Sequence, residues 1–513
     1  MEDSSIIHEA PIGQVRGARD GSPDDFKKQA DLEQFLLFSF ESAGYRRMRT
    51  PVLEFAELHE RKSGAGIVSK LFEVLDGSER PLCLRPELTA GIVRAYNALE
   101  VAPSLPWRVS ASGPVFRRES ELDDARLREF HQIGVELLGA SGPIYDAEII
   151  WLADWSLRKA GVKNATIRIG HVGLILELLD RAGLPKSSRS ALVEMLSALA
   201  AEGGGVKGLE DGVDRLSHWL RSHETTPLPA SLGDDSSDSK GVDRLFRALV
   251  PVVIGRRSGR EILGRLRKKW DVGRGLLDAF ERARDSLRAL SDLKGPATEV
   301  LDRLKRDYES IAPESIASLS GLLDMLQSFD VDLARVELDL GFGRGIGFYS
   351  QMIFECIVPT PLGPVEVCGG GRYDGLARVL GSDRDDRGVG FAIGLERLAG
   401  VIPSKSALPE TLPEHWGSLI VAADPSARLD AIALAHRIRL NGGKAVFDAD
   451  GLADPLGRAR SFGLRFFVTV LGPIDAEGSI RMRDIEGILK QDHVVPLGFF
   501  LPDRDVILKE DSR

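Results

Sequence analysis

The segment from Arg128 to Glu136 constrains the fold most strongly, because its residues alternate in a way that an extended strand would sort onto two faces. One face would carry Arg128, Phe130, Gln132, Gly134 and Glu136, and the other His131, Ile133, Val135 and Leu137. Burying arginine, glutamine and glutamate on one face is costly unless they meet a ligand or one another. The segment therefore predicts a pocket, and an arginine beside a flat aromatic ring suits a nucleotide. The alternative is an edge strand whose polar face is solvated.

Length and composition indicate a globular protein of several domains. A chain of 513 residues has room for roughly two to four domains. Hydrophobic residues make up 43% and charged residues 28%, as in ordinary soluble proteins. No run of about 18 apolar residues occurs, so we expect no transmembrane helix. The acidic, polar start has neither the basic residues nor the apolar run of a signal peptide, which predicts a cytoplasmic protein.

The cysteines and the charge exclude some kinds of site. Cys83, Cys356 and Cys368 are far apart in the sequence and show neither metal-ligand spacing nor a disulfide framework. Each lies in an apolar or glycine-rich stretch, so we expect buried thiols. The formal net charge of −10 argues against indiscriminate binding of nucleic acid, but a local basic surface remains compatible with it.

Three breaks in composition divide the chain: Ser222–Gly241 is predicted to be an exposed loop, Lys294–Pro296 a break in a long helical region, and Ile402–Gly417 a proline-rich linker. Strand and helix patterns predict one α+β domain interrupted by a helical insertion, with a small α/β domain after it. The expected units are residues 1–185 for the first part of the core, 186–322 for the insertion, 323–403 for the second part of the core, 404–417 for the linker and 418–513 for the last domain.

Periodicity locates the main elements. Apolar residues at helical spacing predict helices over Asp24–Ala43 and Ala427–Asn441, from Leu395 onwards and around Leu456–Ser461. Alternating or continuously apolar runs predict strands at Trp107–Val109, Gln132–Leu138, Ala165–Gly170, Val336–Leu340, Gln351–Val358, Gly363–Cys368, Gly388–Ile393, Leu419–Ala423, Ala445–Phe447 and Arg465–Leu471.

Further segments place reactive side chains beside glycines or on extended chain. In Leu84–Thr89 a carboxylate and a hydroxyl two residues apart lie on the same side of the chain, where together they could receive an ammonium group. Glycines in Gly343–Ser350 and Cys368–Gly375 let the backbone approach a ligand closely. In Gly388–Arg397 a glycine-rich strand runs into a helix whose N-terminus favours phosphate. Each segment alone is a weak signal, but their order along the chain is specific.

In that order the segments resemble the class II aminoacyl-tRNA synthetases, and among them the histidine enzyme, over roughly residues 17–182 and 323–401. Pro51 ahead of Val-Leu-Glu resembles motif 1, the dimer-interface element. The segment Phe116–Glu119, together with Arg128 and Phe130, resembles motif 2. The segment Gly390–Arg397 resembles motif 3. Four other segments resemble elements particular to the histidine enzyme: Leu84–Thr89, Gln132–Glu136, Arg344–Tyr349 and Gly369–Asp374. The resemblance implies an antiparallel sheet flanked by helices.

The resemblance also implies a role for each matching residue. Those expected to bind ATP are Arg117 (α-phosphate), Glu119 (adenine amino group), Arg128, Phe130 (stacked base) and Arg397 (γ-phosphate). Those expected to bind histidine are Glu87, Thr89 and Gln132 at the ammonium, Glu136 and Tyr349 at the imidazole, Tyr373 lining the pocket, and Arg344. Arg344 and Arg117 are the catalytic candidates, because placed cations stabilise the charge that develops when the histidine carboxylate attacks the α-phosphate. Mg²⁺ is the implied metal ion, and no residue can be assigned to it.

Two departures from the family pattern bear on activity. The motif 2 loop, Ser120–Ala125, is one residue longer than usual and carries three carboxylates, which would repel the phosphates of a tRNA acceptor stem. In Arg344–Gln351 the arginine and one tyrosine are present, but the usual aspartate and second tyrosine are replaced by Gly347 and Phe348. We expect a pocket that still binds histidine.

The predicted insertion contains a basic cluster, formed by Arg256, Arg257, Arg260, Arg265, Arg267, Lys268, Lys269 and Arg274. In an acidic chain this helical stretch is a candidate surface for a tRNA acceptor arm, and the alternative is an ordinary solvated helix face. The last domain resembles the anticodon-binding domain of the family, although its middle is short and lacks the usual basic helix.

Three functions fit these observations. The leading hypothesis is a homodimeric histidine–tRNA ligase that uses ATP and Mg²⁺ and acts on histidine and histidine tRNA. The second is the non-catalytic, synthetase-like regulatory subunit of ATP phosphoribosyltransferase in histidine biosynthesis, a family that reuses the same core. The third is a paralogue that activates an amino acid for an acceptor other than tRNA. The full motif set and the last domain favour the ligase, whereas the acidic loop and the altered Arg344–Gln351 segment favour the regulatory subunit.

Overall fold

The structure is a computed structural model that describes residues 12–63, 70–74, 77, 80–119, 127–183, 288–290, 292–341, 348–382, 384, 387–403, 417–440, 443–449, 455–461, 464, 466–471, 479–484 and 493–496. The predicted loop Ser222–Gly241, the basic cluster, the acidic loop, Arg344 and residues 404–416 of the predicted linker lie outside these residues. In the part of the chain that is described, no helix is both long and apolar enough to cross a membrane.

A nine-stranded sheet forms the centre of the larger domain, in the order β1-β5-β6-β12-β11-β10-β7-β9-β8. Its strands are β1 (Arg46–Arg47), β5 (Trp107–Phe116), β6 (Glu129–Leu138), β7 (Thr166–His171), β8 (Lys294–Pro296), β9 (Val336–Asp339), β10 (Met352–Thr360), β11 (Gly363–Arg372) and β12 (Gly388–Gly394). Neighbours are antiparallel except for β1 with β5 and β7 with β9. The predicted α+β fold with a largely antiparallel sheet is therefore confirmed.

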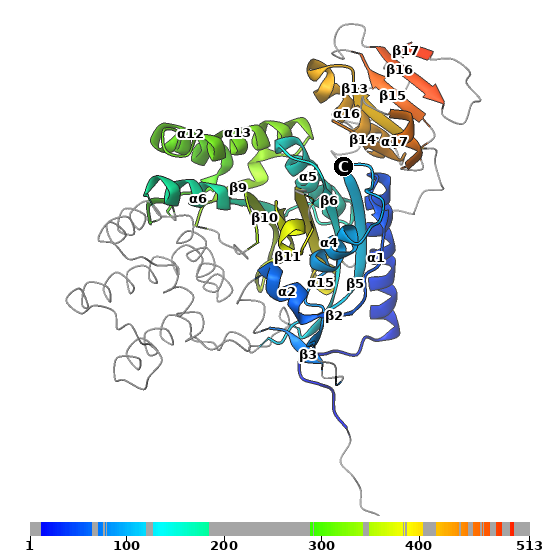
Figure 1. Ribbon diagram of the computed structural model, residues 1–513, viewed down its shortest axis with the longest axis vertical. Helices are drawn as coiled ribbons and strands as arrows, with labels where there is room; N and C mark the ends of the chain where they lie inside the picture. The colour runs from blue at the N-terminus through cyan, green and yellow to red at the C-terminus, as the bar shows by residue number, and fades with distance from the viewer. Residues whose placement is uncertain are drawn as a thin grey trace, which may run out of the picture.

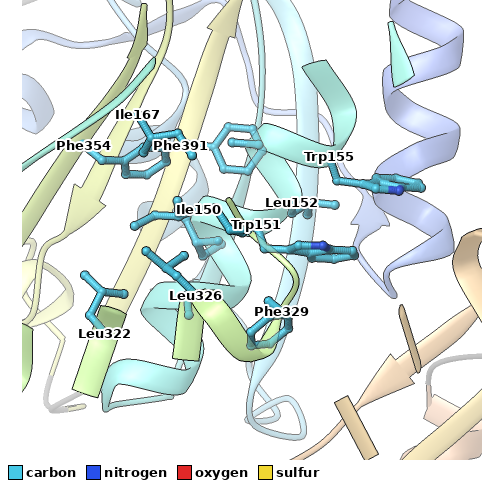
Figure 2. Close-up of a cluster of buried hydrophobic side chains, with 14 of the residues drawn as sticks. Ile150, Trp151, Leu152, Trp155, Ile167, Leu322, Leu326, Phe329, Phe354 and Phe391 are labelled. Carbon is cyan, nitrogen blue, oxygen red and sulfur yellow. The ribbon is translucent and has the colours of Figure 1, made fainter. Parts of the chain in front are cut away.

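Helices cover this sheet and bury its apolar face. They are α1 (Pro23–Ser42), α5 (Pro143–Lys159), α6 (Val172–Arg181), α12 (Ala297–Tyr308), α13 (Pro313–Ser328) and α15 (Leu395–Val401). Figure 2 shows Ile150, Trp151, Leu152 and Trp155 of α5 between Phe354 and Phe391 of the sheet and Leu322 and Leu326 of α13. The predicted apolar face of β6, with Ile133, Val135 and Leu137, joins the same core. Its opposite face is thereby left for the pocket.

Shorter elements lie beside the other face of the sheet, around the site. Strands β2 (Leu53–Phe55), β3 (Phe72–Val74) and β4 (Leu82–Leu84) form a small sheet in the order β2-β4-β3. Helices α2 (Ala56–Ser63), α4 (Thr89–Asn97) and α14 (Leu376–Val379) pack against one another (Figure 1). A single 3₁₀ turn, η1 (Leu333–Arg335), precedes β9.

The C-terminal domain has a second sheet, in the order β14-β13-β15-β16-β17. Its elements are β13 (Ser418–Ala422), η2 (Pro425–Ala427), α16 (Arg428–Leu440), β14 (Ala445–Phe447), α17 (Pro455–Ser461), β15 (Phe466–Val470), β16 (Ser479–Asp484) and β17 (His493–Pro496). Strands β14, β13 and β15 are parallel, whereas β16 and β17 add antiparallel neighbours that the sequence pattern did not predict. The predicted α/β alternation is otherwise confirmed.

The C-terminal domain lies beside the larger one (Figure 1), and buried side chains of the two join in one core. The Trp151 ring on α5 meets His436 of α16 edge-on, with centroids 5.2 Å apart, and the guanidinium of Arg439 lies 4.8 Å from the centroid of the same ring. Arg108 on β5 donates a hydrogen bond of 3.1 Å to the carbonyl of Phe447 on β14. The two domains therefore share one packed interface.

The segment Lys294–Pro296, predicted to interrupt a long helical region, is instead strand β8, which pairs with β9 at the end of the main sheet. Glycine and proline are tolerated at the edge of a sheet, where not every backbone N–H needs a partner. Helices α12 and α13, which follow, pack on α5 and β9 in the main core. Residues 186–287 of the predicted insertion lie outside the described part of the chain.

Candidate active site

Three glycines of neighbouring strands make room for the side chains that the sequence assigns to imidazole binding. Gly390 on β12 lies opposite Glu136 on β6, and a Cβ there would come within 1.9 Å of the Glu136 carboxylate. A Cβ on Gly388 would lie 2.2 Å from the Tyr373 ring, and one on Gly371 would lie 2.9 Å from the Tyr349 ring. The glycines are therefore required as the floor on which these polar groups lie.

Glu136 is buried on this floor without a cation in contact with it among the described residues. The Tyr373 hydroxyl donates a hydrogen bond to its carboxylate, and the hydroxyl of Thr89 is a second partner. Burial is the dominant influence and raises the pKa of Glu136 to about 7, although both hydrogen bonds and the nearby Lys62 oppose it. Burial and the Glu136 charge also raise the pKa of Tyr373, which keeps that hydroxyl a donor.

Glu87 precedes helix α4 and has a different environment. Its carboxylate accepts hydrogen bonds from the backbone N–H groups of Thr89 (2.6 Å) and Ala90 (3.1 Å), the first residues of the helix. Lys62 Nζ lies 2.8 Å from one carboxylate oxygen, and His59 Nδ1 lies 3.5 Å from the other. Burial is the largest single influence and would raise the pKa of Glu87, but Lys62 and His59 together outweigh it and hold the pKa well below its usual value.

Aromatic rings lie close to the groups that contact these two carboxylates. The rings of Phe348 and Tyr349 are 4.1 Å apart, Phe348 lies 6.3 Å from Tyr373, and Lys62 Nζ lies 4.2 Å from the Phe348 centroid. Gln132 lies on β6 opposite Gly394, and its buried Oε1 has no hydrogen-bond partner among the described residues. The pocket thus combines ionised, neutral and unsatisfied polar groups within a few strands of one sheet.

The predicted nucleotide-binding residues lie at the adjoining strand ends. Arg117 follows β5, donates to the Pro86 carbonyl (3.0 Å), and has its guanidinium 5.1 Å from the Phe130 ring centroid. Lys70 Nζ lies 3.1 Å and 3.2 Å from the two carboxylate oxygens of Glu119. Both Arg117 and Phe130 are partly exposed, so a ligand has access to them.

Two further predicted residues flank this group. The backbone N–H of Arg128 donates to Gly17 (2.7 Å), and its buried Nε has no hydrogen-bond partner in the described part of the chain. Arg397, in the first turn of α15, donates to the Glu366 carbonyl at 3.3 Å. Its neighbour Glu396 accepts from the backbone N–H of His131 at 3.0 Å, which ties α15 to β6.

The structure thus brings together the predicted residues of the histidine pocket, except Arg344, which lies outside the described residues. Sequence reasoning missed Lys62, His59 and Lys70, which contact the predicted ligand-binding carboxylates. No periodic pattern marks His59 and Lys62, because the α2 sequence is polar and looks like a solvated helix, and Lys70 lies outside the helix.

The cysteines are buried thiols, and the described residues contain no cluster of metal ligands. Cys83, Cys356 and Cys368 are free and buried, as predicted. Burial raises the pKa of Cys83, and the hydrogen bond with Cys368 followed by burial raises the pKa of Cys356, so these thiols stay protonated. Within the described ranges, His, Cys, Asp and Glu side chains form no group of three or more that could hold a metal ion.

Comparison with known proteins identifies the family. The family described as Histidyl-tRNA synthetase matches residues 17–214 and 243–398. A histidine–tRNA ligase of Pyrococcus abyssi is 29% identical over 481 residues, which cover 93% of this chain and 95% of the ligase. An ATP phosphoribosyltransferase regulatory subunit of Moorella thermoacetica is 30% identical over 453 residues, which cover 88% of this chain and 96% of that subunit.

A solved structure agrees with the fold. The crystal structure of an ATP phosphoribosyltransferase regulatory subunit/histidyl-tRNA synthetase from Bacillus halodurans superimposes with a TM-score of 0.53 at 21% identity, over 91% of this chain and 98% of the other. The family match spans both halves of the larger domain and contains every predicted site residue. This chain therefore belongs to the histidyl-tRNA synthetase family.

Proposed function

We propose that this protein is a histidine–tRNA ligase, which activates histidine with ATP to histidyl-adenylate and transfers it to histidine tRNA. The observation that carries the proposal is the buried Glu136 carboxyl, which receives the Tyr373 hydroxyl above a glycine floor. A buried carboxyl with a pKa of about 7 does not stabilise a fold. It is suited instead to a ligand that brings its own hydrogen-bond donor, such as imidazole.

The geometry supports selection of histidine by its side chain. Glu136 accepts the N–H of the imidazole, and Tyr349 offers a hydroxyl to the other nitrogen. A site built to hydrogen-bond both nitrogens rejects amino acids that lack them by large factors, because its buried polar groups would then be unpaired. The ammonium end of histidine faces Glu87, Thr89 and Gln132.

Activation then needs little covalent chemistry from the protein. Arg117 holds the α-phosphate and Arg397 the γ-phosphate, while Phe130 stacks on adenine and Glu119 receives its amino group; Arg128 lies beside them. Arg344 stabilises the charge that develops as the histidine carboxylate attacks the α-phosphate in line. Mg²⁺ accompanies ATP and neutralises phosphate charge.

Histidine-dependent exchange of pyrophosphate into ATP tests this proposal directly. The parent protein is expected to catalyse exchange, and Arg344→Ala to reduce it about 100-fold or more, because one group that stabilises the transition state is worth that much. Absence of exchange in the folded parent protein would contradict the ligase function. Charging of histidine tRNA is the second measurement, and exchange without charging would point to the acidic loop Ser120–Ala125.

The resemblance of the C-terminal domain and of motif 1 to those of the family also supports proposals about binding partners. The C-terminal domain is proposed to bind the anticodon arm, the basic cluster of the insertion to bind the acceptor arm, and the chain to form a homodimer. Reversing charges between Arg256 and Lys269 should weaken tRNA binding and flatten its salt dependence. An unchanged salt dependence would make that cluster an ordinary solvated surface.

A second function is favoured by the 30% identity to the Moorella thermoacetica regulatory subunit. In that case the pocket would sense histidine without activating it. Histidine binding without pyrophosphate exchange, together with a histidine-dependent change in the activity of an ATP phosphoribosyltransferase catalytic subunit, would establish this alternative. Exchange in the parent protein would exclude a purely regulatory role.

A further inference from the structure

Strand β6 extends beyond the end of β12, one of its two neighbours in the main sheet. Gly394, the last residue of β12, lies opposite Gln132 of β6. The two residues that precede Gln132, Phe130 and His131, therefore have no residue of β12 opposite them. A backbone N–H of β6 that points towards the missing strand needs another acceptor, because unpaired backbone groups inside a protein are costly.

The side chain of Glu396 takes the place of the missing strand. After Gly394 the chain leaves the sheet and enters helix α15, and Glu396 lies in the first turn of that helix. Its two carboxylate oxygens lie 3.0 Å and 3.1 Å from the backbone nitrogen of His131, which donates to both. A hydrogen bond to a charged acceptor is stronger than one to a neutral carbonyl, so this contact joins the end of β6 to α15 firmly.

The residues beside this contact are those expected to hold opposite ends of ATP. Phe130, which should stack on the base, directly precedes His131, and Arg397, which should bind the γ-phosphate, directly follows Glu396. Arg397 also donates to the Glu366 carbonyl of β11 at 3.3 Å, which connects α15 to the far side of the site. The separation of the ring and the guanidinium therefore depends on how the end of β6 lies relative to α15.

We propose that Glu396 is a positioning residue for ATP, which fixes the end of β6 to α15 and so sets the separation of Phe130 and Arg397. This inference rests on the proposed binding of ATP by those two residues. The role requires an acceptor oxygen at this place and not a negative charge, since the donor is a neutral backbone N–H. A bond that served the fold alone would change stability and leave recognition of the phosphates as it is.

The test compares ATP with AMP, each titrated calorimetrically into the full chain in the presence of Mg²⁺. The two nucleotides share the base, the ribose and the α-phosphate, so the ratio of their affinities measures how well the distal phosphates are held. Glu396→Met removes the acceptor at similar size and should lower this ratio about tenfold or more, as for loss of a hydrogen bond to a charged group. Glu396→Gln keeps an acceptor oxygen and should leave the ratio within about threefold of the parent value.

A double-mutant cycle distinguishes positioning from a general loss of stability. Arg397→Met alone should lower the ratio, and adding Glu396→Met to it should have little further effect, because the group that Glu396 places is then absent. Thermal melting of each variant reports folding. Should Glu396→Met not fold, Glu396→Asp replaces it, since the shorter side chain withdraws the oxygens from His131 and should lower the ratio in the same direction.

The outcomes separate the two levels of inference. A parent protein that does not bind ATP, or a ratio that Arg397→Met leaves unchanged, would contradict the proposed nucleotide site itself. If both of those results are as expected, an unchanged ratio in the folded Glu396→Met protein would overturn the role of Glu396. An equal loss in Glu396→Gln, or additive effects in the double variant, would overturn it as well.

Discussion

A methyl group added at position 390 tests whether Glu136 occupies the place where a ligand binds. In Gly390→Ala the new Cβ would lie 1.9 Å from the Glu136 carboxylate and 2.4 Å from the carbonyl oxygen of Val135 on the neighbouring strand. Ordinary contact begins at 3.4 Å, so the carboxylate must move by about 1.5 Å. The carbonyl is part of the ladder between β6 and β12 and cannot rotate away, so the strands must separate locally as well.

The expected cost follows from these distances. Displacing a binding group by about 1 Å lowers catalytic rates about 100-fold, so histidine-dependent pyrophosphate exchange should fall by at least that factor. Overpacking of this kind should also destabilise the protein by about 1–3 kcal/mol. Gly400→Ala is the matched control, because a Cβ there meets nothing within 4 Å on helix α15. It should raise stability by about 0.5–1 kcal/mol and leave exchange unchanged.

Exchange by Gly390→Ala within about threefold of the parent rate, with a normal melting transition, would refute the reasoning. It would mean that Glu136 is not held against the floor by steric necessity, or that histidine does not bind there. Exchange could also fall simply because less of the variant is folded. Chemical denaturation gives the folded fraction, so that the exchange rates can be compared at equal concentrations of folded protein.

Further perturbations test other parts of the molecule. Because the pKa of Glu136 is raised to about 7 in the folded state, the unfolded chain ionises first, and this group lowers stability as pH rises from about 4.5 to 7. Glu136→Gln should therefore stabilise the histidine-free protein at pH 8 relative to pH 5, while weakening histidine binding; an unchanged pH dependence of denaturation would contradict this. Arg108→Met should cost about 3–5 kcal/mol in chemical denaturation, because it strands the buried Glu148, whereas the exposed Lys27→Met should change little. Phe130→Ala should raise the KM for ATP about tenfold with the histidine Kd unaltered, since base stacking is lost; a parallel rise in both constants would argue against stacking.

Much of the fold could be predicted because the relevant patterns are local. The alternation along β6 reflects two buried environments, the apolar core on one side and the pocket on the other, and it identified both. The order of the glycine-rich segments along the chain was equally informative. A glycine is needed opposite a buried carboxylate, as at Gly390, because a larger side chain would clash with it. The first signal lies in consecutive residues of one strand, and the second in the order of short motifs along the chain, so the sequence displays both.

The rest depended on contacts between distant segments. Lys62 lies in a polar stretch of α2 that resembles a solvated helix, and only the approach of Glu87 and Phe348 makes it a buried cation. The residues of β8, Lys294–Pro296, predict a helix break in the sequence because the strand's partner, β9, is more than forty residues away. Tertiary pairing decides such short segments, and local propensity does not.

Buried carboxylates of this protein fall into two kinds, and the difference separates structural sites from the pocket. Glu148 is held by two hydrogen bonds of 2.9 Å from Arg108 and one of 3.0 Å from Tyr45, and Asp146 is paired with Arg372. An arginine balances the charge of each of these two carboxylates, so neither needs a ligand to do so. Glu136 has only hydroxyl partners among the described residues, and its pKa of about 7 means that ionisation costs the folded state about 3 kcal/mol at high pH.

A fold gains nothing from that cost, because a hydrophobic or neutral side chain would fill the same space without it. The free-energy cost of ionising Glu136 is reduced when a ligand donates a hydrogen bond to the carboxylate. That reduction then contributes to the free energy of binding. Glu87 differs from Glu136 in this respect, because Lys62 Nζ lies 2.8 Å from its carboxylate and helps to keep it ionised. The proposed recognition of imidazole at Glu136 rests on this difference, because the described residues place no cation against that carboxylate.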